Sequence, residues 1–336
     1  MKNNSKAWMP GFAALLAGAV AAGLVSTAGG QAATAPLDRA QLMKLGDDYL
    51  SALVAHDPRR LPLAADVRMV ENAKRIQAGE GLWKTTTGGP NPDFRILVPD
   101  PVSQQIGGMA MMQSDGKPAQ VGFRLKIVNG KVTQIEQMLA APRDTSMPNL
   151  TKVRPAIPLE VPYEYADSRG RMIHIAKSYY DALDNNNGHL APFAPDCERH
   201  ENGMRTAPSG GPSLSGAAIA VPGQPARPAT LMGLQDCTTQ MDSGTFLYIS
   251  TIDDRRVELA DPVTGLALGF SHFHHEMKQK DYPIVGDPGR TSTTISFGSG
   301  GFDLPAMHIF KIWGGQIHEI EAMGFMAPYN SPTGWE

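Results

Sequence analysis

The chain carries the same pattern twice, and this internal repeat restricts its fold more than any other feature of the sequence. Within the segment 308–329, residues 308–325 align with 123–140 without a gap, so that Lys311 matches Lys126 and Gly315 matches Gly130. A second ungapped alignment covers segments farther upstream, through the pairs Tyr49/Tyr179, Leu53/Leu183, Asp66/Asp196 and Glu71/Glu201. A period above about 100 residues is too long for one unit of a solenoid, so the repeat predicts two whole domains in tandem.

Each copy begins with an amphipathic helix and continues as strand-like segments. In the first copy, apolar residues recur at helical spacing over 37–54, and Asp38 stands where an N-cap belongs. Alternating runs then predict strands, at 66–72, 94–98, 102–113, 121–128 and 132–139. The last two runs meet at Asn129-Gly130, a turn pair suited to a β-hairpin, and the second copy has Gly314-Gly315 there. We expect an α+β domain with a helical hairpin laid across a curved antiparallel sheet.

Residues 1–32 have the features of a secretory signal peptide. Lys2 and Lys6 form a positive start, 12–25 is apolar and uncharged, and Gly30-Gln31-Ala32 offers a small-x-small cleavage site. The apolar run is shorter than the roughly 20 residues that a spanning helix needs, which favours cleavage over a membrane anchor. We therefore expect a periplasmic or secreted protein without a membrane partner once this segment is removed.

The remaining chain divides into two repeats and a linker. We place the first repeat at 37–140, a semi-stiff proline-rich linker at 141–168, and the second repeat at 169–336, which opens with a helix at 172–183. Equivalent positions of the two copies are separated by more residues in the final hairpin than in the upstream alignment. The second copy therefore contains extra residues between these two segments, and we assign them to an insertion at 205–260. The insertion is predicted to hold a Gly/Pro/Ser/Ala-rich surface loop at 208–228, a helix at 229–241 and a strand at 255–260.

Charge and motifs exclude several classes of function. The formal net charge is −3, and it becomes −5 when residues 1–32 are removed, because that segment carries two lysines and no acid. No basic run is longer than Arg59-Arg60 or Arg255-Arg256, so we expect no nucleic-acid partner. We find no nucleotide, flavin or haem motif and expect no cofactor. No Gly-x-Ser-x-Gly elbow is present, which argues against a serine hydrolase.

Eight of the nine histidines fall in the second repeat, and the densest group lies in 266–276. Strand alternation gives one set of side chains a common face: Leu266, Leu268, Phe270, His272, His274 and Glu276. That face is apolar at one end and ionisable at the other, as a pocket for a small apolar molecule would be. We assign Leu266, Leu268, Phe270 and the strand residue His200 to this pocket. The alternative is a sheet end at which the histidines meet solvent.

If the protein is an enzyme, we expect His272 or His274 to act as general base, assisted by Glu276 or His308. Histidine titrates near neutrality without help, and the matching stretch 106–113 of the first copy has no ionisable residue. His272, His274 and Glu276, with His308 nearby, are also residue types that bind metal ions. Their spacing differs from the cupin pattern, however, and we expect no metal ion.

The helix, the Glu-Asn strand and the hairpin ending at Glu321 resemble the SnoaL-like, or nuclear transport factor 2-like, superfamily. Finer features resemble a secreted two-repeat family known mainly as a domain of unknown function: Glu71-Asn72 with 79–83, then 197–203, Cys237, and Asp261 with Gly265. The resemblance covers nearly the whole mature chain. It implies two tandem cone-shaped domains, each a curved antiparallel sheet wrapped by helices, packed sheet to sheet as an intramolecular pseudo-dimer. It identifies no catalytic residue.

Two functions remain open. The first is a cofactor-independent lyase, isomerase or dehydratase that acts on a small, largely apolar molecule by histidine acid–base chemistry. The second is a non-catalytic domain that binds a small ligand or a protein. A catalyst needs at least one acid–base pair among apolar walls, whereas a carrier can be wholly apolar.

The chain has only two cysteines, Cys197 and Cys237, and both fall in the second repeat. In an exported protein such a pair predicts a disulfide.

Overall fold

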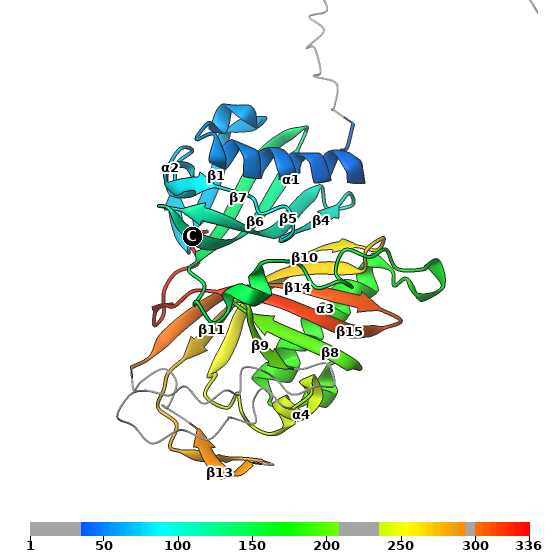
Figure 1. Ribbon diagram of the computed structural model, residues 1–336, viewed down its shortest axis with the longest axis vertical. Coiled ribbons are helices and arrows are strands. Elements are labelled where there is room, and N and C mark those ends of the chain that lie inside the picture. Colours follow the sequence, from blue (N-terminus) through cyan, green and yellow to red (C-terminus); the bar gives the residue numbers. More distant parts are fainter. Residues whose placement is uncertain (1–34, 208–234, 286, 293–299) are drawn as a thin grey trace, which may run out of the picture. The chain divides into compact units, whose positions relative to one another are not determined.

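The computed structural model describes residues 35–207, 235–285, 287–292 and 300–336 (Figure 1). By its internal contacts, the stretch from Thr34 to Glu336 is one compact unit. The predicted signal peptide at 1–32 and the predicted loop at 208–228 lie outside the described residues.

The first repeat is a seven-stranded sheet with one long helix across it (Figure 1). Its elements are α1 (Arg39–Val54), η1 (Pro58–Arg60), β1 (Leu63–Glu71), β2 (Lys74–Ile76), α2 (Leu82–Thr85), β3 (Thr86–Gly88), β4 (Arg95–Asp100), β5 (Gln105–Ser114), β6 (Lys117–Val128) and β7 (Lys131–Ala140). The strand order is β2-β1-β7-β6-β5-β3, and β4 also pairs with β5.

Two details of this repeat differ from the sequence prediction, and a third, the N-cap of α1, agrees with it. The β1–β7 pair is parallel, because β7 returns beside β1 after the antiparallel meander, while the other pairs of the sheet are antiparallel. The helical hairpin is reduced to α1, since α2 has only four residues. The N-cap was predicted correctly: the Asp38 carboxylate accepts a hydrogen bond from Gln41 N–H, and the Gln41 side chain accepts one from Asp38 N–H.

The second repeat has the same plan. Its elements are α3 (Arg169–Asp184), η4 (Gly188–Leu190), β8 (Phe193–Glu201), β9 (Met204–Ala207), α4 (Cys237–Asp242), β10 (Thr251–Asp261), β11 (Leu266–His275), β12 (Tyr282–Ile284), β13 (Asp287–Ser292), β14 (Phe302–Trp313), β15 (Gln316–Gly324) and β16 (Ala327–Pro328). The strand order β10-β11-β14-β15-β8-β9 repeats the order β4-β5-β6-β7-β1-β2 of the first sheet. β12 and β13 pair separately from the main sheet.

The register of the strands corrects the predicted insertion at 205–260. In the first repeat, β4 ends at Asp100 and pairs with β5. In the second repeat, β10 ends at Asp261 and pairs with β11 in the same way, so β10 is part of the sheet that both repeats share. The second copy gains residues in two places, one before the pair Asp100/Asp261 and one between that pair and the final hairpin. The extra residues are therefore divided between the segment before β10 and the segment holding β12 and β13. The predicted helix at 229–241 begins at Cys237 after its N-cap Asp236, and positions 229–234 lie outside the described residues.

Each repeat buries the apolar stripe of its helix against the inner face of its own sheet. In the first repeat, Tyr49 of α1 packs on Trp83 and Phe123, with ring centroids 5.9 and 4.9 Å apart. In the second, Tyr179 of α3 lies 5.3 Å from the ring of Phe310 on β14. Burial of one helix face is what the 3.6-residue period of these segments requires.

The predicted Cys197–Cys237 disulfide is confirmed. It joins β8 to the first residue of α4, with the two Cα atoms 6.0 Å apart and both residues buried. The cross-link closes a loop with a sequence separation of 40 residues. In the chain-entropy model such a loop stabilises the fold by roughly 3–4 kcal/mol.

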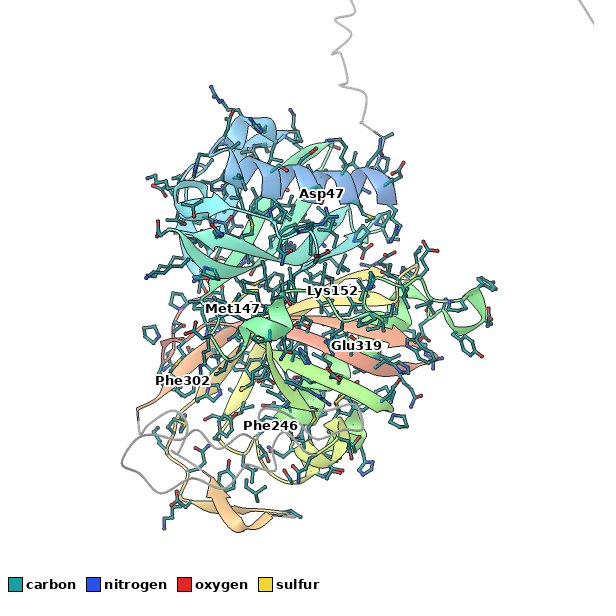
Figure 2. All side chains as sticks on the ribbon, in the orientation of Figure 1. Asp47, Met147, Lys152, Phe246, Phe302 and Glu319 are labelled. Carbon is teal, nitrogen blue, oxygen red and sulfur yellow. A yellow bond between two sulfur atoms is a disulfide. The ribbon has the colours of Figure 1, made fainter. Side chains whose placement is uncertain are left out.

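Besides the core between helix and sheet in each repeat, a further apolar core forms where the outer faces of the two sheets pack against each other. Its members come from both repeats and from the connecting segment: Phe94, Ile96, Val98, Met109, Met111, Met138, Leu150, Ile157, Leu259, Leu266, Leu268, Phe270, Met307, Ile309 and Met323. Met147 of η2 (Met147–Leu150), labelled in Figure 2, packs against the same core. The predicted linker thus adheres to the second sheet, where Arg154 donates to the carbonyls of Glu198 and Ile320.

Two ion pairs between the repeats are reciprocal. Arg39 at the start of α1 binds Asp261 of the second repeat, with Nη2 and Oδ2 2.8 Å apart. Its counterpart Arg169 at the start of α3 binds Asp100 of the first repeat, with Nε and Oδ2 2.7 Å apart. In a twofold dimer, residue i of one subunit contacts j of the other and j contacts i. These pairs follow that rule within a single chain.

None of the described helices has the length and apolar character needed to cross a bilayer.

We expect Asp100→Ala to lower the free energy of unfolding by about 3 kcal/mol. Asp100 has no exposed surface, and its carboxylate also accepts hydrogen bonds from three backbone N–H groups, of Val102, Ser103 and Ala260. Its loss leaves Arg169 and these donors unpaired. Asp48→Asn is the control: it removes an exposed ion pair with Lys44 and should change the free energy by no more than about 0.5 kcal/mol. Urea unfolding measures the free energy of unfolding of both variants. Equal values for Asp100→Ala and Asp48→Asn would contradict the role of Asp100 in joining the two repeats.

Candidate functional site

The face of β11 that was predicted to line a pocket is covered by the first repeat. Leu266, Leu268 and Phe270 are at most 3% exposed and belong to the core between the sheets. Their assignment to a ligand pocket is therefore wrong. Alternation along the strand correctly put them on one face, but it carries no information about what packs on that face.

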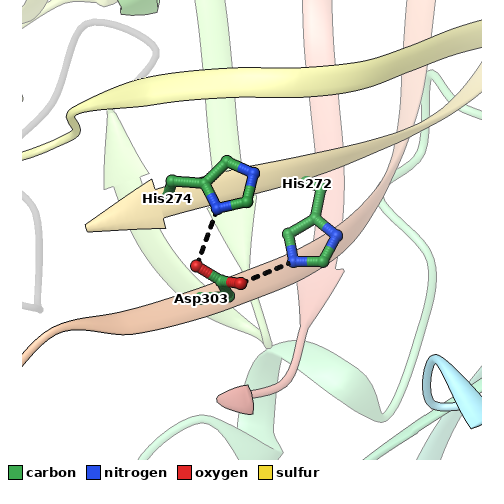
Figure 3. Close-up of side chains that lie close together, drawn as sticks. All are labelled: His272, His274 and Asp303. Atoms are coloured by element: carbon green, nitrogen blue, oxygen red, sulfur yellow. Dashed lines mark hydrogen bonds and ion pairs between the residues drawn. The ribbon is translucent and has the colours of Figure 1, made fainter. Parts of the chain in front are cut away.

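At the far end of the same face, His272 and His274 converge on Asp303 of β14 (Figure 3). His274 Nδ1 lies 2.8 Å from Asp303 Oδ1, and His272 Nε2 lies 3.1 Å from Asp303 Oδ2. The two imidazole rings are nearly parallel, with centroids 4.7 Å apart. Asp303 is fully buried and directly opposite His274 in the strand register, so the backbone pairing fixes this cluster.

Asp303 was missed by the sequence analysis, which named Glu276 as the assisting acid. β11 ends at His275, and Met277 takes a positive φ of 54°, so the alternation does not continue to Glu276. The Glu276 carboxylate instead accepts a hydrogen bond from Tyr329 at 3.1 Å and pairs with Lys278. Asp303 lies across from His274 in the pairing of β11 with β14. Prediction of that pairing could have identified Asp303.

The surroundings of His272 are apolar and tight. Burial lowers the pKa of His272, although Asp303 opposes the shift, so its imidazole is mainly neutral at pH 7. A cavity of about 30 Å³ adjoins it, with Phe270, Ser271, Ala306 and Thr333 in its wall. That volume accommodates roughly one water molecule.

His308 lies on the opposite face of the sheet, inside the second repeat. It is in register with Gly269 of β11, and its ring lies 5.8 Å from Phe273 and 5.3 Å from Tyr179. Tyr180 Oη lies 3.3 Å from its Nδ1. The prediction that His308 assists His272 is therefore wrong, because alternate strand positions point to opposite sides.

Burial, together with the positive charge of Arg199, lowers the pKa of His308 to about 3. Burial raises the pKa of Tyr179 and of Tyr180 far above the usual value for tyrosine. All three side chains are neutral at physiological pH.

Arg199 brings a buried positive charge to the same interior. It has no exposed surface, its Nε donates to Thr206 Oγ1 at 2.9 Å and lies 3.0 Å from Glu201 Oε1, and its Nη2 donates to Gln240. Phe246, labelled in Figure 2, lies 4.9 Å below the guanidinium. Among the described residues, Nη1 has no hydrogen-bond partner. Burial of a guanidinium costs free energy unless such partners compensate for the lost hydration.

His200 points away from this interior because it follows Arg199 on β8. Its Nε2 lies 2.7 Å from Glu198 Oε1, on the sheet face that carries Arg154 and Glu321. It does not line the cavity that adjoins Phe270 and His272, so the structure does not place His200 with the β11 residues.

Comparison of the two repeats shows which polar side chains are present in the interior of the second repeat but not in that of the first. The positions of Tyr180, Arg199 and His308 are occupied in the first repeat by Leu50, Met69 and Phe123, which belong to its apolar core. Aligning the two copies position by position would have found this set from the sequence.

Solved structures that resemble parts of the chain have low sequence identity. A protein from Jannaschia sp. CCS1, provisionally named a SnoaL-like polyketide cyclase, is 11% identical over 47% of this chain and 86% of its own, with a TM-score of 0.27. An NTF2-like protein from Burkholderia thailandensis E264 is 12% identical over 46% of this chain and 89% of its own, with a TM-score of 0.23. A de novo designed NTF2-fold protein is 17% identical over 34% of this chain and 97% of its own, with a TM-score of 0.22. No curated protein sequence matches this chain.

The tandem architecture predicted from the sequence is confirmed: two repeats share one strand order, and each lays a helix across its sheet. A family model described as a domain of unknown function (DUF8021) matches residues 35–139 and 165–324, well over half of the chain. The chain therefore belongs to the DUF8021 family.

Proposed function

We propose that the interior of the second repeat binds a small, largely apolar molecule with a carbonyl or acidic end and rearranges it by acid–base chemistry. The reaction class is isomerisation, dehydration or cyclisation. The observation that carries the proposal is the cluster of Tyr180, Arg199 and His308 among aromatic walls, at positions where the first repeat has Leu50, Met69 and Phe123.

The comparison between repeats argues against a purely structural role for this cluster. The first interior is stable with three apolar side chains at these positions. Replacing a buried apolar side chain with a charged one typically destabilises a domain, by several kcal/mol for an ion left without full pairing. The first repeat has Met69 at the position of Arg199, so the shared fold does not require a buried charge there, and a ligand with a carbonyl or acidic end would give this charge a function.

Each side chain of the cluster has a role in such a reaction. The neutral imidazole of His308 accepts a proton from a carbon next to the substrate carbonyl, and the electron pair moves onto the carbonyl oxygen. Arg199 and the Tyr180 hydroxyl stabilise the resulting oxyanion. Return of the proton from the imidazolium to another carbon completes an isomerisation. Transfer of the same proton to a β-hydroxyl, which leaves as water while the oxyanion returns to a carbonyl, completes a dehydration.

A pKa of about 3 makes His308 a weak base in the free protein. The positive charge of Arg199 is one of the two causes of that low value. Negative charge that develops on a substrate beside Arg199 offsets this effect and raises the pKa of His308 toward neutrality. The base is thus strengthened as the transition state forms.

We also propose that the protein works outside the cytoplasm. The signal-peptide features of residues 1–32 support this, and so does the Cys197–Cys237 disulfide, because such bonds persist in oxidising compartments. The full chain produced in a bacterium with a general secretion pathway should appear outside the cytoplasm with Ala33 as its first residue, as measured by intact mass. Recovery of uncleaved protein with free thiols in the cytoplasm would sink this part of the proposal.

The catalytic proposal is tested by hydrogen exchange on a bound substrate analogue. A panel of small enones, ketones and aromatic acids is first screened for compounds that raise the melting temperature of the wild type. NMR in D₂O then measures the exchange of the protons next to the carbonyl in each bound compound. We expect His308→Gln to slow this exchange by roughly 10²–10⁴-fold, because it removes the base while keeping a polar side chain.

Two further variants refine this test. Arg199→Met, which installs the residue of the first repeat, should weaken binding and exchange together. His189→Gln changes an exposed histidine of the same repeat and should have no effect. If compounds bind with equal affinity to wild type and Arg199→Met, and no proton exchanges, the second repeat is a binding domain or the site lies elsewhere.

The low pKa of His308 also predicts a pH dependence of stability. The pKa in the unfolded chain is near 6.5, and in the folded chain it is about 3. Between these values the unfolded state binds a proton that the folded state does not, so stability falls as the pH falls, by roughly 1.4 kcal/mol per pH unit from this group. Above pH 6.5 the group has no effect. His308→Phe should therefore lose less stability than the wild type between pH 6.5 and pH 4, as urea unfolding would measure. Parallel curves would show that His308 is not buried as described.

A further inference from the structure

The cluster of His272, His274 and Asp303 lies apart from the interior site, on the other face of the same sheet. We propose that these three side chains form a binding site for one divalent transition-metal ion, with Zn²⁺ as its simplest representative. Two imidazoles and a carboxylate are a ligand set that zinc and non-haem iron use in proteins. The sequence analysis considered His272 and His274 together with Glu276 and His308 as metal ligands and expected no metal ion, and it did not include Asp303, which lies on a different strand.

The ligand atoms converge without any rearrangement of the backbone. One nitrogen of each imidazole and one carboxylate oxygen all lie within 4.8 Å of one another. His274 Nδ1 lies 2.8 Å from Asp303 Oδ1 and His272 Nε2 lies 3.1 Å from Asp303 Oδ2, so each imidazole faces its own oxygen of one carboxylate. Small ring rotations would bring the two nitrogens closer together.

The surroundings orient the ligands as those of metal sites do. Ser331 donates its backbone N–H to Asp303 Oδ2 at 2.8 Å, which fixes the carboxylate. Asp253 Oδ2 lies 3.5 Å from His274 Nε2, the nitrogen that faces away from Asp303. A ligating histidine usually gives its second N–H to such a carboxylate, which fixes the ring and its tautomer.

The first repeat shows that the fold does not need this cluster. The strand registers place Met111 and Gln113 of β5 at the positions of His272 and His274, and Pro118 of β6 at the position of Asp303. The same pair of strands therefore forms in the first repeat without any of the three ligands. A satisfied hydrogen-bond network needs a donor and an acceptor, but it does not require two histidines on one carboxylate.

The test uses the full chain without an affinity tag, stripped with a chelator, and Zn²⁺ alone as the probe. Competition with a chromophoric chelator should show one high-affinity ion per chain. His274→Gln and His272→Met, which install the residues of the first repeat, should each weaken Zn²⁺ binding by at least roughly 10–100-fold. His189→Gln, which removes an exposed histidine that lies 3.4 Å from Asp242, should bind Zn²⁺ like the wild type.

A second readout guards against loss of folding. Circular dichroism and the melting temperature without metal establish that each variant is folded, and His274→Gln is the safest of them because His274 is partly exposed. Co²⁺ added to the stripped protein should give visible absorption bands that His274→Gln abolishes. The proposal is overturned if the folded wild type takes up no stoichiometric Zn²⁺, or if His274→Gln binds it equally well. Neither result concerns His308. If the metal-site proposal fails, the proposed function of the interior site is still tested separately, by hydrogen exchange on a bound compound.

Discussion

The burial of one sheet against the other is the constraint on which the rest of the structure depends. Apolar side chains of β4, β5, β10, β11 and β14 form a shared core, and the reciprocal ion pairs Arg39–Asp261 and Arg169–Asp100 also join the two repeats. This core removes the outer sheet faces from solvent. Among the described residues of the second repeat, one cluster of ionisable groups lies inside the repeat, around His308, and another lies at the end of the sheet, around Asp303.

Duplication provides an internal control for these clusters. Helix, strand order and register are shared, so a difference between equivalent positions does not reflect the needs of the fold. In the first interior, Tyr49 bonds to Gln137, which in turn bonds to Glu71, and the rest is apolar. In the second, a neutral histidine and a cationic arginine share the space. The polar groups of the second repeat are additions to a scaffold that already folds.

The sequence predicted the elements better than the surroundings of the side chains. Periodicity and turn residues located the helices and most strands, because these depend on local spacing. The disulfide followed from the cysteine count. The role of Leu266, Leu268 and Phe270 was wrong because alternation defines a face without naming what covers it. Asp303 was missed and His308 misplaced for the same reason: both depend on how β14 pairs with β11, which the spacing within either strand does not encode.

The first repeat also acts as a scaffold for the Asp303 cluster, through the end of the chain. Ser331 binds Asp303, and four residues later Trp335 reaches the first repeat, where its carbonyl accepts a hydrogen bond from Arg68 at 2.6 Å. The Trp335 ring lies 5.4 Å from the Arg68 guanidinium and 5.7 Å from that of Arg124. Such contacts hold an end segment that would otherwise fray. Because the tail is fixed at both repeats, the position of Ser331, and with it the orientation of the Asp303 carboxylate, depends on a domain that contributes no ligand itself. Retention of a chemically plain first repeat is explained by this dependence.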